Sequence, residues 1–160
     1  MTIEFDIKMD AKSLGGFVLY HNYMRPGGIL GIVLSVAAIV ALILRWDHWT
    51  GLQRCLLIVL ALIFMVFQPL MLLQKANTQL QSGAFRTPMH YVFDEGSFVI
   101  SQEDKREAFV YADIRKAVFH KNVMYLYMTA VSAFIIPRKS CEADFDNVRE
   151  LVKAGRKSGR

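Results

Sequence analysis

Two long uncharged stretches divide the chain. Residues 27–44 and 55–73 contain 18 and 19 residues, and neither includes a charged side chain. As helices they would extend about 27–29 Å, close to the roughly 30 Å hydrocarbon core of a bilayer. Neither has the polar stripe of a helix at a soluble protein's surface. Because only Arg45–Arg54 joins them, the pattern predicts an antiparallel transmembrane hairpin over residues 27–73.

The first 26 residues carry a different pattern. Apolar and polar side chains alternate strictly over residues 2–9, as expected for a half-buried β-strand. A lone strand is unstable, so its partner should be a sheet formed later in the chain. Residues Asp10–Met24 then predict a helix before the first span, with Asp10 as its N-cap.

The residues after the second span predict a connector over 74–88 and a folded domain over 89–160. The connector is polar and should begin as an extension of the second helix. Six short strand-like runs follow, with Gly96 expected at positive φ in the first turn, and then a helix over Ala143–Ala154 that Gly155 should end. The six runs are residues 89–93, 97–101, 106–111, 117–120, 124–128 and 133–136.

Together these elements predict an α+β membrane protein. The six strands should form a small, strongly bent antiparallel sheet or barrel, joined by the N-terminal strand and capped by the C-terminal helix. That is the outline of a pleckstrin-homology-like (PH-like) domain.

Two local sequence features indicate how the hairpin helices pack and where the second one deforms. Small residues recur at every fourth position in Gly27, Gly31 and Ser35, a spacing that lets two helix backbones approach closely in lipid. Packing against the second helix of the same chain explains this stripe, and homodimerisation is the alternative. In the second span, Pro69 lacks an N–H and restricts Gln68, which predicts a kink or an early helix end.

The distribution of Lys and Arg predicts the orientation. The short linker carries Arg45 and Arg54, whereas the outer flanks carry five basic residues, which are Lys8, Lys12, Arg25, Lys75 and Arg86. Basic residues near membrane spans accumulate on the cytoplasmic side. Both termini are therefore expected in the cytoplasm.

The side chains that could carry chemistry are scattered. Cys55 and Cys141 lie far apart in sequence, and the four histidines have no second ligand at metal-binding spacing. No phosphate-binding loop, dinucleotide fingerprint or nucleophile motif is present. We therefore expect no enzyme activity, no catalytic residue, no cofactor and no metal. The net charge of +5 is too weak and dispersed for nucleic acid.

Six basic residues near the C-terminus form the candidate site. Basic side chains held below a bilayer attract anionic headgroups, so we interpret them as a candidate lipid-surface contact. A solvated basic helix end is the alternative, because cations are favoured near a helix C-terminus. The six residues are Arg138, Lys139, Arg149, Lys153, Arg156 and Lys157.

Several segments resemble a known family. The run FDEGSFVIS from Phe93, YADIRKA from Tyr111, YLYM from Tyr125 and AFIIPRK from Ala133, followed by an amphipathic helix, is similar to the YcxB-like family of bacterial membrane proteins. The family usually has Trp where this chain has Tyr111. The resemblance implies a multi-pass protein of the bacterial inner membrane with a PH-like domain, and it brings no established activity or catalytic residue.

Two functions remain open at this point. The first is a non-enzymatic adaptor anchored at the cytoplasmic face of the inner membrane, whose PH-like domain binds a protein or a lipid headgroup. The alternative is an accessory or assembly subunit, including an immunity-type protein, that contacts a larger complex through its membrane helices. In both, the partners are the lipid bilayer and a protein not identified by the sequence.

Overall fold

The structure is a computed structural model that describes residues 2–82, 85 and 87–158. Some residues of the predicted connector and of the predicted domain lie outside these described residues. Arg86, which contributed to the predicted orientation, is one of them. The chain divides into two compact units. One combines residues 1–14 with 80–160, and the other comprises residues 15–79.

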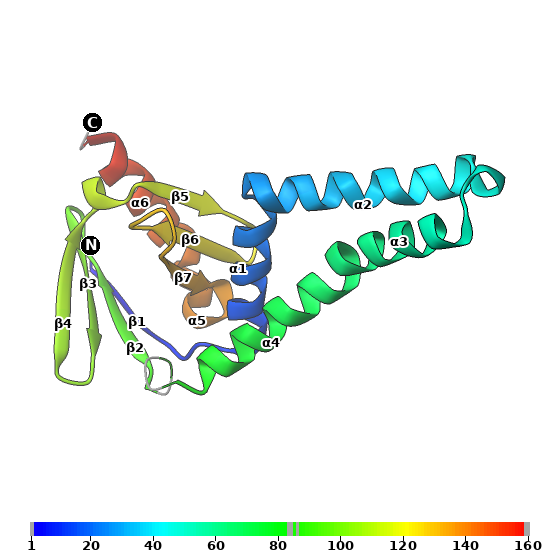
Figure 1. The fold of residues 1–160 in the computed structure, drawn as a ribbon. Coiled ribbons are helices and arrows are strands. Elements are labelled where there is room, and N and C mark those ends of the chain that lie inside the picture. The colour runs from blue at the N-terminus through cyan, green and yellow to red at the C-terminus, as the bar shows by residue number, and fades with distance from the viewer. Residues whose placement is uncertain (1, 83–84, 86, 159–160) are drawn as a thin grey trace. The chain divides into compact units, whose positions relative to one another are not determined.

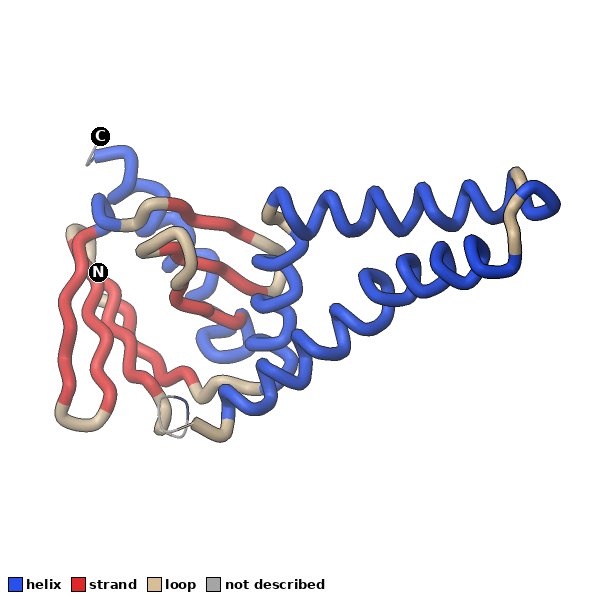
Figure 2. The backbone as a smooth tube through the Cα atoms, in the orientation of Figure 1, coloured by secondary structure: helices blue, strands red, loops and turns tan. Residues whose placement is uncertain are grey.

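The first unit contains the seven strands found among the described residues. They are the arrows of Figure 1 and the red segments of Figure 2. They lie close to the predicted positions and confirm an α+β fold with antiparallel sheets. One sheet has the order β1-β2-β3-β4 and the other β5-β6-β7. Their bounds are β1 Ile3–Ile7, β2 Met89–Phe93, β3 Ser97–Gln102, β4 Lys105–Val110, β5 Lys116–Phe119, β6 Val123–Tyr127 and β7 Ala133–Pro137.

The N-terminal strand joins the sheet, as the alternation predicts. β1 pairs antiparallel with β2 from Ile3↔Phe93 to Ile7↔Met89, and Ile3 and Ile7 point into the core. The side chain Oδ1 of Asp10 accepts a hydrogen bond from Ser13 N at 3.3 Å, which confirms the predicted N-cap. In the sequence, the residues of the second unit therefore lie between two strands that pair within the first unit.

The strands do not form the single bent sheet or barrel that the pattern suggested. Among the described residues they form two sheets, and β4 and β5 are not paired. The chain between them makes a 3-10 turn at Tyr111–Asp113, in which the side chain of Asp113 accepts a hydrogen bond from Val110 N. Burial of Tyr111 and Ile114 draws this segment into the core, which interrupts strand pairing.

Aromatic side chains fill the space between the sheets. Phe98 of β3 stacks on Phe93 and Phe109, with ring centroids 5.3 Å apart in both pairs. Phe134 of β7 meets the Phe98 ring edge-on at 6.2 Å, so side chains from both sheets share one core. Pro137 lies at the end of the edge strand β7, where its missing N–H removes no central ladder bond.

A helix covers this core, as predicted, but it begins and ends at other residues than the predicted Ala143 and Ala154. α6 spans Phe145–Ser158 and buries Phe145, Val148 and Val152 completely. Gly155 does not end the helix, because the chain continues through it; the prediction was wrong. Before α6 the chain forms a short helix that the sequence pattern did not reveal, α5 at Arg138–Cys141.

The β2–β3 turn also differs from expectation. No described glycine has a positive φ, so Gly96 does not play the predicted role. The residue with a left-handed backbone is instead Glu103, with a φ of 52° in the β3–β4 turn.

The second unit is built from the two long apolar helices. α1 spans Ala11–Tyr23 and crosses the boundary between the units, and α2 spans Pro26–Leu44. After a 3-10 turn at Trp46–His48, the chain forms α3 at Gly51–Leu62, which runs beside α2 (Figure 1). Thr50 caps α3, since its side chain accepts from Gln53 N while the Gln53 side chain accepts from Thr50 N.

The helix does not end early at Gln68-Pro69. A π-helical turn at Ile63–Phe67 follows α3, and α4 then continues over Gln68–Leu80. Pro69 cannot donate to the carbonyl four residues earlier, and the wider π turn just before it accommodates that loss. The predicted deformation is therefore present as a change of helix type. The continuation to Leu80 confirms that the helix extends beyond the apolar stretch.

Candidate functional site

Two of the six predicted basic residues, Arg138 and Lys139, form ion pairs within the first unit. Arg138 Nη2 lies 2.8 and 2.9 Å from the two carboxylate oxygens of Asp146, and its Nε donates to Lys121 O. Lys139 Nζ lies 2.8 Å from Asp10 Oδ2. Desolvation raises the pKa of Asp10, but hydrogen bonds from Lys139 and Ser13 outweigh it and the pKa is lowered. These cations hold α5 against α6 and against the start of α1.

The other four lie on α6, and two of them cover an aromatic ring. The Arg149 guanidinium carbon lies 5.4 Å and Lys153 Nζ 5.7 Å from the ring centroid of Phe119 in β5. Arg156 Nη2 donates to Arg115 O at 3.4 Å, just before β5. Lys157 is exposed. The sequence predicted that these cations share one side of a helix. The structure shows that Phe119 of β5 faces two of them. Whether they contact lipid stays a prediction.

Tyr111 fixes the position of α6. Its ring lies directly against the backbone of Gly155, where a Cβ would be 2.1 Å from Tyr111 Cδ2. Its hydroxyl donates to Asp94 O at 2.5 Å in the β2–β3 turn. The buried side chain of Tyr111 therefore connects its own 3-10 turn with the β2–β3 turn and with α6. Burial, with a smaller contribution from Asp94, raises the pKa of Tyr111 to about 12.

We expect the stability of the first unit to fall at high pH. Burial raises the pKa of Tyr91, and that of Cys141 rises to about 11 from 9.0. The unfolded chain therefore loses these protons first, and the free energy of unfolding should decrease from about pH 9 to pH 12 by at most about 1.4 kcal/mol per pH unit per group. Urea midpoints measured by circular dichroism across this range test it.

The variant Tyr111→Phe is the control for the pH dependence. Its free energy of unfolding should be lower at neutral pH, because the hydrogen bond to Asp94 O is lost. Between pH 10 and pH 12 that free energy should decrease less steeply than in the unchanged protein, because the titrating hydroxyl of Tyr111 is absent. An equal slope in both proteins would contradict the assignment to Tyr111.

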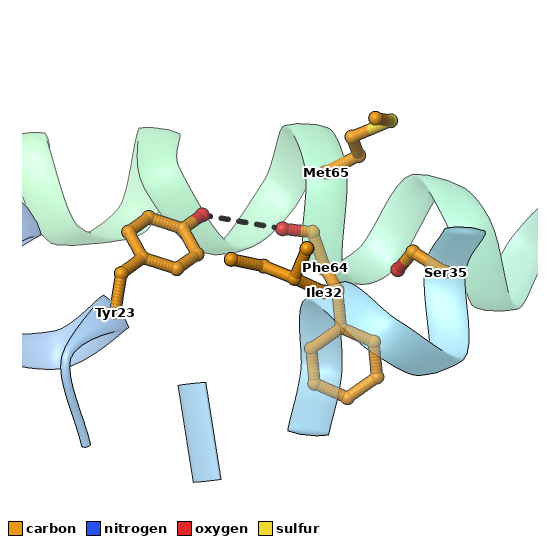
Figure 3. A pocket seen from close by; sticks show the side chains of 5 residues that line it. All are labelled: Tyr23, Ile32, Ser35, Phe64 and Met65. Atoms are coloured by element: carbon orange, nitrogen blue, oxygen red, sulfur yellow. Dashed lines mark hydrogen bonds between the residues drawn. The ribbon is translucent and has the colours of Figure 1, made fainter. Parts of the chain in front are cut away.

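A small pocket lies in the second unit, beside the π turn. It has a volume of about 260 Å³ and is lined by Tyr23, Ile32, Ser35, Phe64 and Met65. Figure 3 shows the Tyr23 hydroxyl directed at the main-chain carbonyl of Phe64, to which it donates at 3.3 Å. The Ser35 hydroxyl donates to Gly31 O at 3.0 Å. Because both hydroxyls have acceptors, the pocket offers mostly carbon surface.

The stripe of small residues lies partly at this contact. Gly31 and Ser35 are buried, and a Cβ on Gly31 would be 2.5 Å from the ring of Phe64. Gly27 is exposed, with nothing within 4 Å of its Cβ position. The close approach at this end of α2 occurs at Gly28 instead, against the backbone of Asn22.

Two polar atoms of this unit have no hydrogen-bond partner among the described residues. They are Asn22 Nδ2 and Gln68 Oε1, and both are buried. Gln68 borders the π turn, and Asn22 precedes the pocket residue Tyr23. A buried donor or acceptor without a partner costs about 1–3 kcal/mol, so each is a place where a further polar group would stabilise the protein.

A contact between a histidine and two carboxylates joins β1 and β2. His90 Nδ1 lies 2.7 Å from Asp6 Oδ1, and its Nε2 lies 3.9 Å from Glu4 Oε2. These side chains lie on the exposed face of the sheet, where the cross-strand register places them side by side. Across the described parts of the chain, no three His, Cys, Asp or Glu side chains gather in a group able to hold a metal ion.

The residues that sequence reasoning missed are those that face the basic side of α6. Phe119 and the carbonyl of Arg115 belong to β5 and the turn before it, about 30 to 40 positions earlier in the chain. Periodicity identifies which residues share one side of a helix, but it contains no information about the strand opposite. The buried Nε of Arg149 likewise has no local signal.

Comparison with known proteins supports the family resemblance. No curated protein and no solved structure matches the chain. One family model, described as YcxB-like protein, matches residues 93–152. The matched segment runs from the end of β2 to α6 and includes Tyr111, Phe119 and Arg149. The match covers 60 of the 160 residues and agrees with the resemblance in the sequence of that segment.

Proposed function

We propose that this protein is a membrane-anchored, non-enzymatic adaptor of the bacterial inner membrane. Its two long apolar helices cross the membrane with both termini on the cytoplasmic side, and the unit with the two sheets is a PH-like domain that binds a partner there. The observation that carries the proposal is the insertion of the helices between β1 and β2. Membrane anchoring then restrains the domain through two chain connections that begin at paired residues, Ile7 and Met89.

The surface of the helices supports the membrane assignment. Only 28% of the span in Pro26–Leu44 and 6% of that in Gly51–Leu80 is buried within the structure. Leucine and isoleucine side chains such as Ile43 and Leu52 are more than 70% exposed. A water-soluble protein would leave this apolar surface in water, whereas lipid covers it without cost. A continuous helix of 30 residues extends about 45 Å, long enough to cross the bilayer and emerge.

The arrangement of the first unit supports the PH-like assignment. Its sheets of four and three strands share one core, and the C-terminal helix α6 covers that core. The edge strand β4 leaves Lys105–Ala108 exposed. An exposed edge and a basic helix side are surfaces through which small β-domains bind partners.

A second candidate is an accessory subunit that acts through its membrane helices. The buried Asn22 Nδ2 and Gln68 Oε1, which lack partners among the described residues, favour it. Rotation of these side chains toward a helix from another protein would supply the missing hydrogen bonds, and polar side chains inside membranes pair in this way.

Site-specific photo-crosslinking in the native membrane distinguishes the two candidates. A photoreactive amino acid is placed in the full-length chain at exposed sites of the domain, Ala108 and Val131, or at exposed sites of the helices, Val59 and Phe67. The adaptor predicts one discrete protein adduct from the domain sites and lipid adducts from the helices. Protein adducts from the helices alone, or adducts to further copies of this chain alone, would refute it.

Cysteine labelling tests the topology separately. In a background with Cys55 and Cys141 replaced by Ala, cysteines are introduced at Asp47 in the linker and Glu103 in the β3–β4 turn, both exposed. A membrane-impermeant maleimide should label Asp47→Cys in spheroplasts, and Glu103→Cys only after permeabilisation. The reverse pattern would show that the domain faces the other side.

A further inference from the structure

The Nε of Arg149 is buried without a hydrogen-bond acceptor among the described residues, whereas the residue as a whole is partly exposed. The described residues also provide no ion pair or hydrogen bond to its other donors. The face of Phe119 covers one side of the guanidinium at 5.4 Å. A ring face attracts a cation but accepts none of its five N–H groups in the manner of an oxygen. Arg149 is therefore held in place with unused donors.

The surroundings of Arg149 are strongly cationic. Lys153 lies over the same Phe119 ring, and Arg156 lies about one turn beyond Lys153 on α6. A hydrogen bond from Lys153, with smaller contributions from Arg149 and Lys157, lowers the pKa of Glu150. Glu150 is bonded to Lys153 Nζ at 2.8 Å. Three cations, Lys153, Arg149 and Lys157, therefore act on one carboxylate.

The other nearby carboxylate does not neutralise this group. Asp146 lies one turn before Arg149 on α6, but both of its oxygens accept from Arg138 Nη2. Lys139 is likewise paired with Asp10. Arg138, Lys139 and Lys153 are therefore each paired with one carboxylate, and the excess positive charge on α6 comes from Arg149, Arg156 and Lys157.

We propose that Arg149, Lys153 and Arg156, seated against Phe119, form a binding site for a phosphate group. A guanidinium presents paired donors that match two oxygens of a phosphate, and a partly buried site screens this attraction less than bulk water does. Inorganic phosphate and phosphate monoesters carry about −1.5 to −2 charges at pH 7 and a lipid phosphodiester carries one, and a negative charge of either size suits this cationic excess. The site deepens the proposed function, on which it rests, because it gives the binding module a ligand class. The phosphate belongs to a lipid headgroup or to a soluble phosphate compound.

The Arg149 side-chain resonance reports directly on the site. Full-length protein labelled with ¹⁵N-arginine is placed in nanodiscs of zwitterionic phosphatidylcholine, and its Nε–Hε signal is assigned by its loss in Arg149→Lys. Inorganic phosphate is then titrated against chloride at equal ionic strength. A parallel sample contains nanodiscs with phosphatidylglycerol. We expect a saturable shift of this signal, and about tenfold weaker phosphate binding in Arg149→Gln.

Arg106→Gln is the matched control, because Arg106 is exposed on β4 and its removal changes the net charge equally. It should leave phosphate binding unchanged. A response to inorganic phosphate supports a site for soluble phosphate compounds, and a response only to phosphatidylglycerol supports the headgroup source. No response to either, or an equal loss in Arg106→Gln, overturns the site. The photo-crosslinking above would still stand, so the two proposals fail separately.

Discussion

A chain that lacks residues 1–9 is expected to lose the folded state of the unit that contains both sheets. β1 contributes Ile3 and Ile7 to the core, and each buried isoleucine is worth about 1.5–3 kcal/mol. Its removal also leaves β2 with an unpaired edge along five residues. The two isoleucines account for about 3–6 kcal/mol, and the loss of the packing of Phe5 and of the five-residue β1–β2 pairing adds to this. Because small domains are stable by only about 5–15 kcal/mol, the combined loss should leave most molecules unfolded at 25 °C.

The measurement compares two soluble chains. In both, residues 15–79 are replaced by a flexible glycine-serine linker, whose length adds little to the cost of closing the loop. The chain with residues 1–14 should give dispersed amide NMR signals and cooperative thermal unfolding, whereas the chain without residues 1–9 should give neither. Addition of a peptide of residues 1–10 should restore part of the signal. A cooperative fold without β1 would contradict the prediction.

The second large effect is expected at Gly155. In an exposed helix interior, Gly→Ala would stabilise by about 1 kcal/mol. Here the new Cβ would lie 2.1 Å from Cδ2 and 2.8 Å from Cβ of Tyr111, closer than atoms can pack. Tyr111 is 1% exposed and bonded to Asp94 O, so its ring has no free space into which to move. We expect Gly155→Ala to lower the free energy of unfolding by about 2 kcal/mol or more, measured by urea denaturation.

A double-mutant cycle separates this contact from a general effect on the helix. In a Tyr111→Leu background the same Gly155→Ala change should cost much less, because the atoms it meets are gone. Gly96→Ala is the control, since nothing lies within 4 Å of the Cβ position of Gly96, and its effect should stay within about 0.5 kcal/mol. Equal costs of Gly155→Ala in both backgrounds would show that Tyr111 is not the obstacle.

The extent of sequence-based prediction differs between the elements and the site. The strands, the helix before the first span and the two apolar helices agree with the alternation, the Asp10 cap and the absence of charge. Even the pairing of β1 with a sheet more than 80 residues further along the chain followed from the instability of a lone strand. The site was predicted only as a set of basic residues, and the sequence does not distinguish the paired Arg138 and Lys139 from the unpaired Arg149.

The sequence by itself determined the α+β organisation, the position of most elements and the YcxB-like pattern, because periodicity and capping act between residues close in the chain. The tertiary structure alone decided the rest. It divided the strands into two sheets, kept α6 helical through Gly155 against Tyr111, and inserted a π turn before Pro69. It also placed the Arg149 guanidinium over the ring of Phe119 and paired Arg138 with Asp146. These outcomes depend on which distant side chains share a volume, and packing sets that after the local elements have formed.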